Sequence, residues 1–235
     1  MVNKKNIAVI QARLGSSRLN NKIFLKFGSE TSLSFLVKRI LKSKLIDEVV
    51  IAIPKTKKNL KLKNYIKNKG YNFFEGNENN VLSRYYKAAK KFKAKNIIRV
   101  TADCPFHDPA LIDNAIKIFE RKKIDYLSNF NPPSFPDGFD LSIMKFETLK
   151  KTFQSAKNSY DKEHVVPYML RSKKFKKINI KSKINLSQLR LTLDEFKDYE
   201  LLKKLSEKLK KNFTYQDIIK LYKKNKKIFS YNKDI

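Results

Sequence analysis

Short apolar runs alternate with amphipathic stretches along the first half of the chain. The runs at 6–12, 48–54 and 96–102 are almost entirely apolar, which is typical of parallel strands buried on both faces. Residues 32–43, between the first two runs, and residues 109–122, after the third, repeat apolar positions three and four apart, which predicts helices that pack one face inward. Strands and helices in this order predict an α/β fold, with a largely parallel sheet between helical layers.

Shorter and less regular patterns complete the expected fold. Pro109 suits the first position of a helix, where its missing N–H is tolerated, and Pro167 indicates a kink or a turn. The segment 130–140 is rich in turn formers and is expected to be a loop. The other expected strands are at 71–74, 125–129, 141–146, 175–181 and 189–193, and the other expected helices are at 57–69, 79–93, 147–157, 161–171, 195–210 and 214–225.

The loop after the first strand has the composition of an anion site. It reads RLGSSRLNNK and places a Gly-Ser-Ser turn between Arg13 and Arg18, with Lys22 just beyond. Small residues let backbone N–H groups surround an anion, and the three cations could neutralise a triphosphate. The loop lacks the Gly-Lys-Ser/Thr ending of a Walker A motif. An ordinary turn is the alternative, but three cations around it favour an anion site.

Two acidic residues follow apolar segments that are expected to be strands. Asp103 follows NIIRVTA and Asp194 follows LRLTL. Ligands of such sheets bind beyond the carboxyl ends of the strands, where two carboxylates could together hold Mg²⁺. Each residue taken singly is better explained as a helix cap. Taken together, and opposite a cationic loop, they favour a metal site.

The net charge is the feature of the composition that could favour a different function. The 235 residues include 53 Lys and Arg against 22 Asp and Glu, a net charge of +31, which would suit a nucleic-acid partner. The excess is almost all lysine and is spread over every expected helix and loop, whereas arginine, the better reader of bases and phosphates, is scarce. We therefore favour a solvated lysine surface, with a nucleic-acid-binding face as the alternative.

The sequence is that expected of a cytoplasmic protein with no membrane partner. Hydrophobic residues make up 41% of the chain, which is enough for a sizeable core, but no apolar run approaches the length of a membrane span. The N-terminus lacks the long apolar core and the cleavage site of a signal peptide. Cys104 is the single cysteine and cannot form an internal disulfide, which fits a reducing compartment.

The two histidines and the cysteine give weaker indications. His164 lies in a polar segment beside Glu163, and the sequence favours neither a packed side chain nor an acid–base group there. His107 is expected in a loop and Cys104 as a small buried side chain. Because no Cys/His cluster surrounds Cys104, the sequence argues against zinc.

The N-terminal stretch AVIQARLGSSRLNNK resembles the IxARxGSxRLPxK signature of the cytidylyltransferases that make CMP-activated sugar acids. Within that family the chain is similar to spore coat polysaccharide biosynthesis protein F and its relatives, in the same order along nearly its full length. The other segments that carry the resemblance are KLIDEVVIAIP, FFEGNENNVLSRYYKAAKKFKAKNIIRVTADCPFHDPALID, SNFNPPSFPDGFDLSIMKFETL, DKEHVVPYMLR and LSQLRLTLDEFKDYELLKKL.

The resemblance implies a three-layer α/β/α, Rossmann-like nucleotidyltransferase fold with a mainly parallel mixed sheet. Residues 1–235 would form one nucleotidyltransferase domain, with about 130–170 as an inserted segment for acceptor binding and dimerisation. The implied reaction transfers CMP from CTP to a sugar or sugar-acid acceptor and releases pyrophosphate, with Mg²⁺ as cofactor, for surface polysaccharide or glycan precursors. A homodimer is also implied, and Phe135, Phe139 and Met169 are candidates for its contact.

The resemblance also assigns roles to individual residues. The catalytic residues would be Arg13, Lys22 and Asp103, and the metal ligands Asp103 and Asp194. The residues that would bind the nucleotide are Ala12, Arg13, Gly15, Ser16, Ser17, Arg18, Lys22, Gly76, Asn77 and Arg84. The residues that would face the acceptor are Asp137, Asp140, Glu163 and His164.

The sequence departs from the family pattern at a few positions. Asn20 and Asn21 stand where the family usually has Pro-Gly, and Ala102 stands where it usually has Gly. These changes should alter the stiffness of loops more than the chemistry. Glu75 stands where Arg is common, and an acidic group there could weaken nucleotide binding or alter the contacts to the base.

Two other functions are compatible with the residues. One is a nucleotidyltransferase that uses another nucleotide and a sugar phosphate or another small phosphorylated acceptor. The other is a basic, non-catalytic protein that binds nucleic acid with a steep salt dependence and releases no pyrophosphate. The general base stays open between a metal-bound water and one of Asp137, Asp140 and His164, and the sequence does not identify the acceptor.

Overall fold

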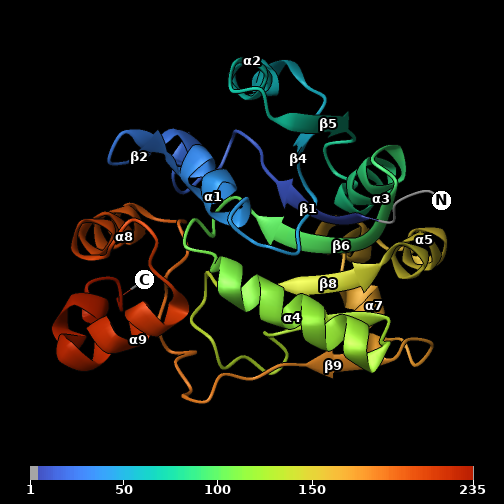
Figure 1. The fold of residues 1–235 in the computed structure, drawn as a ribbon. Helices are drawn as coiled ribbons and strands as arrows, with labels where there is room; N and C mark the ends of the chain where they lie inside the picture. Colours follow the sequence, from blue (N-terminus) through green and yellow to red (C-terminus); the bar gives the residue numbers. More distant parts are fainter. Residues whose placement is uncertain (1–4, 235) are drawn as a thin grey trace.

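A seven-stranded sheet forms the centre of the computed structural model, which describes residues 5–234 (Figure 1). Its strand order is β5-β4-β1-β6-β8-β7-β9. β8 runs antiparallel to both of its neighbours, and the other neighbouring pairs are parallel, which confirms the mainly parallel mixed sheet. The strands are β1 (Lys5–Gln11), β4 (Glu48–Pro54), β5 (Asn72–Gly76), β6 (Ala94–Thr101), β7 (Tyr126–Ser128), β8 (Ser142–Lys145) and β9 (Lys177–Asn179).

Alternating side chains on β1 explain why helices cover both faces of the sheet. Ala8 and Ile10 lie in one hydrophobic cluster and Ile7 and Val9 in another, because successive side chains of a strand point to opposite faces. The first cluster includes side chains of α1 (Ser32–Ile40), α2 (Leu60–Asn68) and α4 (Pro109–Lys122). The second includes side chains of α3 (Val81–Lys91), α5 (Phe146–Ser155) and α7 (Pro167–Arg171). The three-layer α/β/α fold is therefore confirmed.

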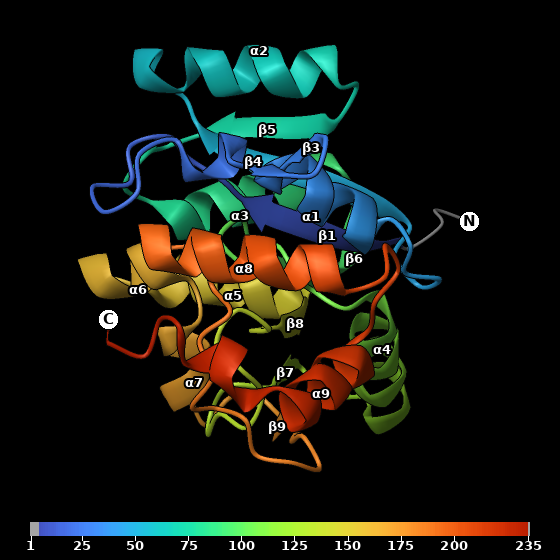
Figure 2. The ribbon, with the colours of Figure 1, turned by 90° about the vertical axis from the view of Figure 1, so that its left-hand side faces the viewer.

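The C-terminal helices form a third cluster beside the sheet. Figure 1 shows α8 (Phe196–Lys208) and α9 (Tyr215–Lys224) together in orange and red, and Figure 2 views them from their own side. Leucines of the 189–193 segment pack against them, together with Phe106 and Phe139. This cluster fastens the end of the chain next to the carboxyl end of β6.

The strand predicted at 189–193 is wrong. Among the described residues, this segment forms one isolated β-bridge, between Arg190 and Asp137. Leu193 instead donates its N–H to the carbonyl oxygen of Asp103 at 2.7 Å. The alternating leucines reflect one face buried in the third cluster, and the backbone finds its partners in loops rather than in a neighbouring strand.

Other boundaries follow the pattern more closely. β4 and α4 begin and end where the sequence predicts. The helix predicted at 161–171 is divided into α6 (Ser159–His164) and α7, because Val165 has a left-handed φ of 71° and Pro167 opens the second helix. The helix predicted at 57–69 begins as η2 (Lys57–Asn59) and continues as α2. Short elements that the pattern missed are η1 (Lys22–Phe24), β2 (Lys26–Phe27), β3 (Glu30–Thr31) and η3 (Lys226–Ser230).

The three apolar side chains proposed for a dimer contact lie inside the fold. Phe135, Phe139 and Met169 are 6%, 0% and 0% exposed. The two phenylalanines belong to the third cluster and Met169 to the cluster beneath α3 and α5. Their proposed role in dimerisation is therefore wrong, because their apolar surface is already used within the chain.

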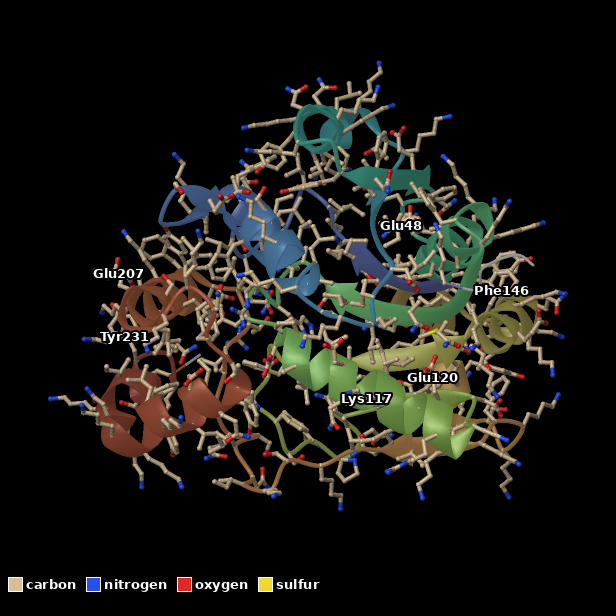
Figure 3. All side chains as sticks on the ribbon, viewed as in Figure 1. Glu48, Lys117, Glu120, Phe146, Glu207 and Tyr231 are labelled. Carbon is tan, nitrogen blue, oxygen red and sulfur yellow. The ribbon has the colours of Figure 1, made fainter. Side chains whose placement is uncertain are left out.

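Lysine side chains are distributed over the surface rather than gathered on one face. Nitrogen-tipped side chains project all round the outline of the molecule in Figure 3. Acidic side chains lie among them, as Glu120 does beside Lys117 on α4. This distribution fits the solvated lysine surface that the sequence favours. Within residues 5–234, every helix is too short or too polar to cross a membrane.

Candidate active site

The loop after β1 forms one wall of a cavity of about 250 Å³ at the carboxyl ends of β1 and β6. Gly15 has a left-handed φ of +97°, which lets the chain turn with little steric cost. The residues of the expected phosphate site that line the cavity are Ala12, Arg13, Gly15, Ser16, Ser17, Arg18 and Lys22. Opposite them, Asp103 and Asp194 complete the lining.

Lys22 lies between the two predicted metal ligands. Its Nζ is 2.7 Å from Oδ1 of Asp194 and 3.4 Å from Oδ2 of Asp103. Arg18 approaches the other oxygen of Asp194, with its Nη2 at 3.0 Å. Two carboxylates that are far apart in the sequence therefore meet opposite the arginine-flanked loop, in the arrangement that the sequence predicts.

Backbone and side-chain contacts fix Asp103 at the end of β6. Its carbonyl oxygen accepts the N–H of Leu193. Burial raises the pKa of its carboxyl group, but Lys22 and hydrogen bonds from Thr101 and Cys104 outweigh that effect, so the net pKa lies below its ordinary value. Asp103 is therefore a carboxylate at neutral pH. Cys104 is buried, as the sequence predicts.

Asp198 positions Asp194 from the first turn of α8. Its Oδ2 accepts the backbone N–H of Asp194 at 3.0 Å and that of Glu195 at 2.9 Å. Arg190 donates two further hydrogen bonds at 2.9 Å, and Asn232 donates one at 2.7 Å. Because this carboxylate is 0% exposed, its hydrogen bonds fix the course of the chain into α8.

Helix capping does not account for Asp103 or Asp194. The cap of α4 is Asp108, whose carboxylate accepts an N–H of the first turn at 2.8 Å. The cap of α8 is Glu195, one residue after Asp194. The capping alternative is therefore wrong for both residues, and their carboxylates face the cavity.

The donors of this pair fit a magnesium ion. Carboxylate oxygens are ligands that Mg²⁺ prefers, and Mg²⁺ commonly binds through one or two carboxylates together with waters and substrate phosphates. Within the described residues, no group of three His, Cys, Asp or Glu could hold a metal by itself. Asp103 and Asp194 therefore fit the sparse ligand set of a metal–nucleotide site better than a closed structural site.

Asn59 supports the loop, a role that the sequence pattern does not predict. Asn59 is 1% exposed, and its Oδ1 accepts the N–H of Leu14 at 2.8 Å. The adjacent Lys58 lies over Gly15, where an added Cβ would meet its Nζ at 2.6 Å. η2 therefore braces the loop and adds a cation beside it. The available signal was a polar segment after the carboxyl end of the second strand, at the same edge of the sheet.

A second cavity of about 340 Å³ shares Arg13 with the first and lies between α3 and α6. Its lining includes Asn77 from the part of the site expected to bind the nucleoside, and Glu163 from the part expected to face the acceptor. The structure therefore brings one residue of each expected group, Asn77 and Glu163, to one place. The other lining residues are Glu78, Asn79, Asn80, Val81, Ser159 and Lys162.

The side chain of Arg84 holds the backbone of the loop that lines this second cavity. It is 1% exposed, and its Nη1 donates to the carbonyl oxygens of Asn77 at 2.7 Å and Glu78 at 3.1 Å. Its side chain packs on Gly76, where an added Cβ would lie 2.8 Å from its Cγ. Arg84 and Gly76 thus shape the loop that lines the cavity, and neither residue lines the cavity itself.

Glu75 points away from the second cavity. Its carboxylate pairs with Lys63 of α2 at 2.6 Å. The neighbouring Phe74 packs on the opposite face of the sheet, against the cluster that contains α3. Glu75 is therefore not placed to contact a base in that cavity, and Lys63 balances its charge.

Asp137 and Asp140 line neither of the two cavities, but their charges act on each other and on Asp103 of the first cavity. Burial, together with the charges of Asp137 and Asp103, raises the pKa of Asp140 to about 6, against the opposing effect of Arg99. Burial also raises the pKa of Asp137, although Arg190 approaches it at 3.9 Å and opposes the shift. Asp140 is thus a carboxylate at neutral pH that can accept a proton more readily than an ordinary aspartate.

Neither histidine lines a cavity of the site. His164 is exposed, and its ring packs against that of Tyr160 with their centroids 4.5 Å apart. His107 is fully buried, and burial together with the charge of Arg39 lowers its pKa to about 4. His107 is therefore a neutral core residue, and the structure gives His164 no contact with the carboxylates of the first cavity.

Gly138 shapes the loop that carries Asp137 and Asp140. Its φ is +99°, and an added Cβ would lie 2.3 Å from the carbonyl oxygen of Leu191. We expect Gly138→Ala to lower the free energy of unfolding by about 2–4 kcal/mol, through backbone strain and overpacking. Denaturant unfolding would measure this loss. Gly28→Ala is the matched control, because Gly28 also has a positive φ but open space around it. Equal losses in the two variants would contradict the steric argument.

Comparison with known proteins places the chain among nucleotide-transferring enzymes. A family model described as Cytidylyltransferase matches residues 7–235. A cytidylyltransferase structure from Leptospira borgpetersenii is 35% identical, with a TM-score of 0.91 over 97% of each chain. An uncharacterized protein of Methanocaldococcus jannaschii, MJ1063, is 33% identical over 98% of this chain and 96% of its own length. The spore coat polysaccharide biosynthesis protein SpsF of Bacillus subtilis is 30% identical over 85% of each chain.

Proposed function

The chain belongs to the cytidylyltransferase family and is a nucleotidyltransferase, and from this premise we propose that it joins CMP from CTP to a sugar or sugar-acid acceptor. The product would serve as a precursor of surface polysaccharide or another glycan. One observation carries the proposal: Asp103 and Asp194 meet at Lys22, opposite the arginine-flanked loop that lines the first cavity. We also expect the enzyme to act in the cytoplasm as a homodimer.

The first cavity offers a triphosphate both charge and backbone donors. Arg13, Arg18 and Lys22 line it together with the Gly-Ser-Ser turn. Guanidinium and ammonium groups bind phosphate oxygens through charge-assisted hydrogen bonds, and a turn of small residues lets backbone N–H groups approach closely. Lys58, which lies over Gly15, adds a further cation at the edge of the loop.

Asp103 and Asp194 would hold Mg²⁺, which when bound would neutralise phosphate charge and polarise the α-phosphate. In the structure, the ammonium group of Lys22 forms ion pairs with both carboxylates. In the reaction we expect its ammonium group and the guanidinium of Arg13 to stabilise the charge that develops on the α- and β-phosphates. The chain therefore contributes positioning and charge rather than a covalent intermediate.

The proposed reaction is an in-line displacement at phosphorus. An acceptor oxygen attacks the α-phosphorus of CTP, the bond from that phosphorus to the bridging oxygen breaks, and pyrophosphate leaves. The acceptor hydroxyl must lose its proton to a base. We assign that role to Asp140, because its charge interacts with that of Asp103 in the first cavity and its pKa is raised to about 6.

Nucleotide selectivity tests the choice of base. In the presence of Mg²⁺ we expect CTP to raise the melting temperature more than equal concentrations of UTP, GTP or ATP, because binding to the folded state alone adds RT ln(1 + [L]/Kd) to stability. At a concentration about a hundred times Kd, this amounts to about 2.7 kcal/mol. Differential scanning fluorimetry would measure the shifts. A larger shift with another nucleotide would favour the alternative of a different nucleotide donor.

Pyrophosphate release separates the enzyme from a nucleic-acid-binding protein. We expect CTP to give pyrophosphate only with Mg²⁺ and an acceptor, measured by a coupled phosphate assay. We also expect no shift of RNA or DNA in a gel at physiological salt, because the lysines are distributed over the surface. A nucleic-acid shift without pyrophosphate release from any acceptor would reverse this conclusion.

A further inference from the structure

The segment that follows β4 is anchored to the loop after β1. β4 lies beside β1 in the sheet, and η2 comes shortly after its end. Asn59 of η2 donates its backbone N–H to the carbonyl oxygen of Thr56 at 3.0 Å and its Nδ2 to the Thr56 hydroxyl at 2.8 Å. Its Oδ1 accepts the N–H of Leu14 at 2.8 Å. A buried side chain with both polar atoms paired therefore holds η2 against the loop.

This anchoring places the side chain of Lys58 across the glycine of the turn. A Cβ added to Gly15 would lie 2.6 Å from both the Cε and the Nζ of Lys58. Gly15 lines the first cavity, with Asp103 and Asp194 on the opposite side. Lys58 is exposed, and the end of a lysine side chain is flexible, so a ligand at the loop can reach its ammonium group.

Two of the cations that line the first cavity are already paired with carboxylates. Lys22 pairs with Asp103 and Asp194, and Arg18 also pairs with Asp194. Within residues 5–234, no carboxylate pairs with Lys58. A nucleoside triphosphate carries about four negative charges at neutral pH, more than one Mg²⁺ ion offsets. An ammonium group without a carboxylate partner is therefore available beside the loop for the phosphates.

We propose that Lys58 binds the β- and γ-phosphates of CTP, the part that leaves as pyrophosphate. This inference rests on the proposed function and adds a residue to its site. The transferred α-phosphate must approach the acceptor and the proposed metal ligands Asp103 and Asp194. Lys58 lies on the loop side of the cavity and contacts neither of those carboxylates, so it is placed for the other two phosphates.

The role of Lys58 in the reaction is electrostatic. As the acceptor oxygen forms its bond to the α-phosphorus, the bond from that phosphorus to the bridging oxygen breaks. The electron pair of the broken bond stays on the bridging oxygen, which becomes an oxygen of pyrophosphate. The ammonium group of Lys58 stabilises the charge that develops on this leaving group and keeps its own protons.

Calorimetric titrations in the presence of Mg²⁺ separate the leaving group from the rest of the nucleotide. The probes are α,β-methylene CTP, which cannot release pyrophosphate, CMP, which lacks the β- and γ-phosphates, and pyrophosphate itself. The proteins are the wild type, Lys58→Gln, Lys58→Arg and the control Lys57→Gln. Lys57 is an exposed lysine of the same η2, so its variant loses the same charge, whereas the atoms found over Gly15 belong to Lys58.

We expect Lys58→Gln to raise the Kd of the CTP analogue and of pyrophosphate by about tenfold, because a hydrogen bond between charged groups is lost. The Kd of CMP should not change. Lys58→Arg should recover most of the affinity, since a guanidinium group also binds phosphate. Lys57→Gln should bind every probe as the wild type does. The melting temperature without ligand should be the same in all four proteins, because both lysines are exposed.

Three results would overturn the inference. The first is an unchanged Kd of the CTP analogue and of pyrophosphate in Lys58→Gln. The second is an equal loss of affinity for CMP and for the CTP analogue, which would show that Lys58 supports the loop rather than the leaving group. The third is an equal loss in Lys57→Gln, which would trace the effect to net charge. Failure of wild-type protein to bind the CTP analogue would instead reject the proposed function, and with it the role built on that function.

Discussion

Replacing Asp103 by Asn is expected to lower kcat by about a thousandfold or more and to leave the fold intact. The carboxylate lies 3.4 Å from Nζ of Lys22 and faces Asp194 across the same ammonium group. The amide has the same shape but no charge, so the variant would lose the proposed metal ligand and the charge balance with Lys22 together. A loss of about 4 kcal/mol in transition-state stabilisation corresponds to that factor.

The fold should tolerate this change because Asp103 makes its structural contact through its backbone. The Leu193 N–H binds the carbonyl oxygen of Asp103, which the substitution keeps. The side chain is one-third exposed, so its ion pair with Lys22 is screened by solvent and contributes about 1 kcal/mol or less. We therefore expect the melting temperature to fall by only a few degrees.

The control for Asp103→Asn is the same change at the other end of the sheet. Asp125 immediately precedes β7, and its carboxylate pairs with Lys145 at 2.8 Å, away from both cavities. Asp125→Asn should leave kcat for CTP and acceptor within about twofold of wild type, because it alters a screened surface pair. Steady-state pyrophosphate release and the Mg²⁺ dependence of the rate would be measured for both variants. Full activity of Asp103→Asn would exclude Asp103 from the proposed metal site.

The meeting of the candidate-site residues at one edge of the sheet could be predicted because it depends on strand order more than on the exact bounds of the elements. β1 and β6 read as buried apolar runs, and parallel strands bring their carboxyl ends to one edge. The loop after β1 and Asp103 after β6 therefore had to be neighbours. Asp194 meets the other residues although its predicted strand is wrong, since the segment before it reaches the same edge without forming a strand.

Residues whose roles depend on contacts between distant segments of the chain could not be predicted in the same way. In the sequence, Arg99 is one polar residue in an apolar run. That Ser142 lies beside it could be known only from the antiparallel pairing of β6 with β8. Asn59 could be found only once η2 was seen to turn back onto the loop at Leu14. The alternating leucines before Asp194 led to the wrong prediction of a strand. Burial on one side of a segment produces this pattern whether or not neighbouring strands exist.

Asp198→Ala is expected to lower the free energy of unfolding by about 3–5 kcal/mol and to reduce activity as well. The residue is 0% exposed and accepts hydrogen bonds from Arg190, Asn232 and the N–H groups of Asp194 and Glu195. Removing one partner of a buried pair leaves the other charge uncompensated, and several donors lose their acceptor. Asp194 would lose the contact that orients it toward Lys22.

The pH dependence of the unfolding free energy distinguishes the contribution of the charge of Asp198 from that of its shape. Burial raises its pKa, but hydrogen bonds from Arg190, Asn232 and the backbone outweigh that effect, so the folded-state pKa lies below the ordinary 3.8. A lowered folded-state pKa gives stability that is present above the unfolded-state pKa and is lost as the pH falls through the folded-state value. The difference in unfolding free energy between wild type and Asp198→Asn should therefore be full at neutral pH and should shrink below about pH 4.

Asp217 provides a matched control because it has the same place in α9 that Asp198 has in α8. Both residues complete a capping box in the first turn, but Asp217 has no buried arginine partner and is partly exposed. Asp217→Ala should cost about 1 kcal/mol and leave activity unchanged, because it loses only a cap. Urea unfolding and pyrophosphate release would be compared for the two variants. If the two substitutions cost the same, the network around Asp198 would be no more than a helix cap, and Asp194 would owe its position to its ion pairs with Arg18 and Lys22 instead.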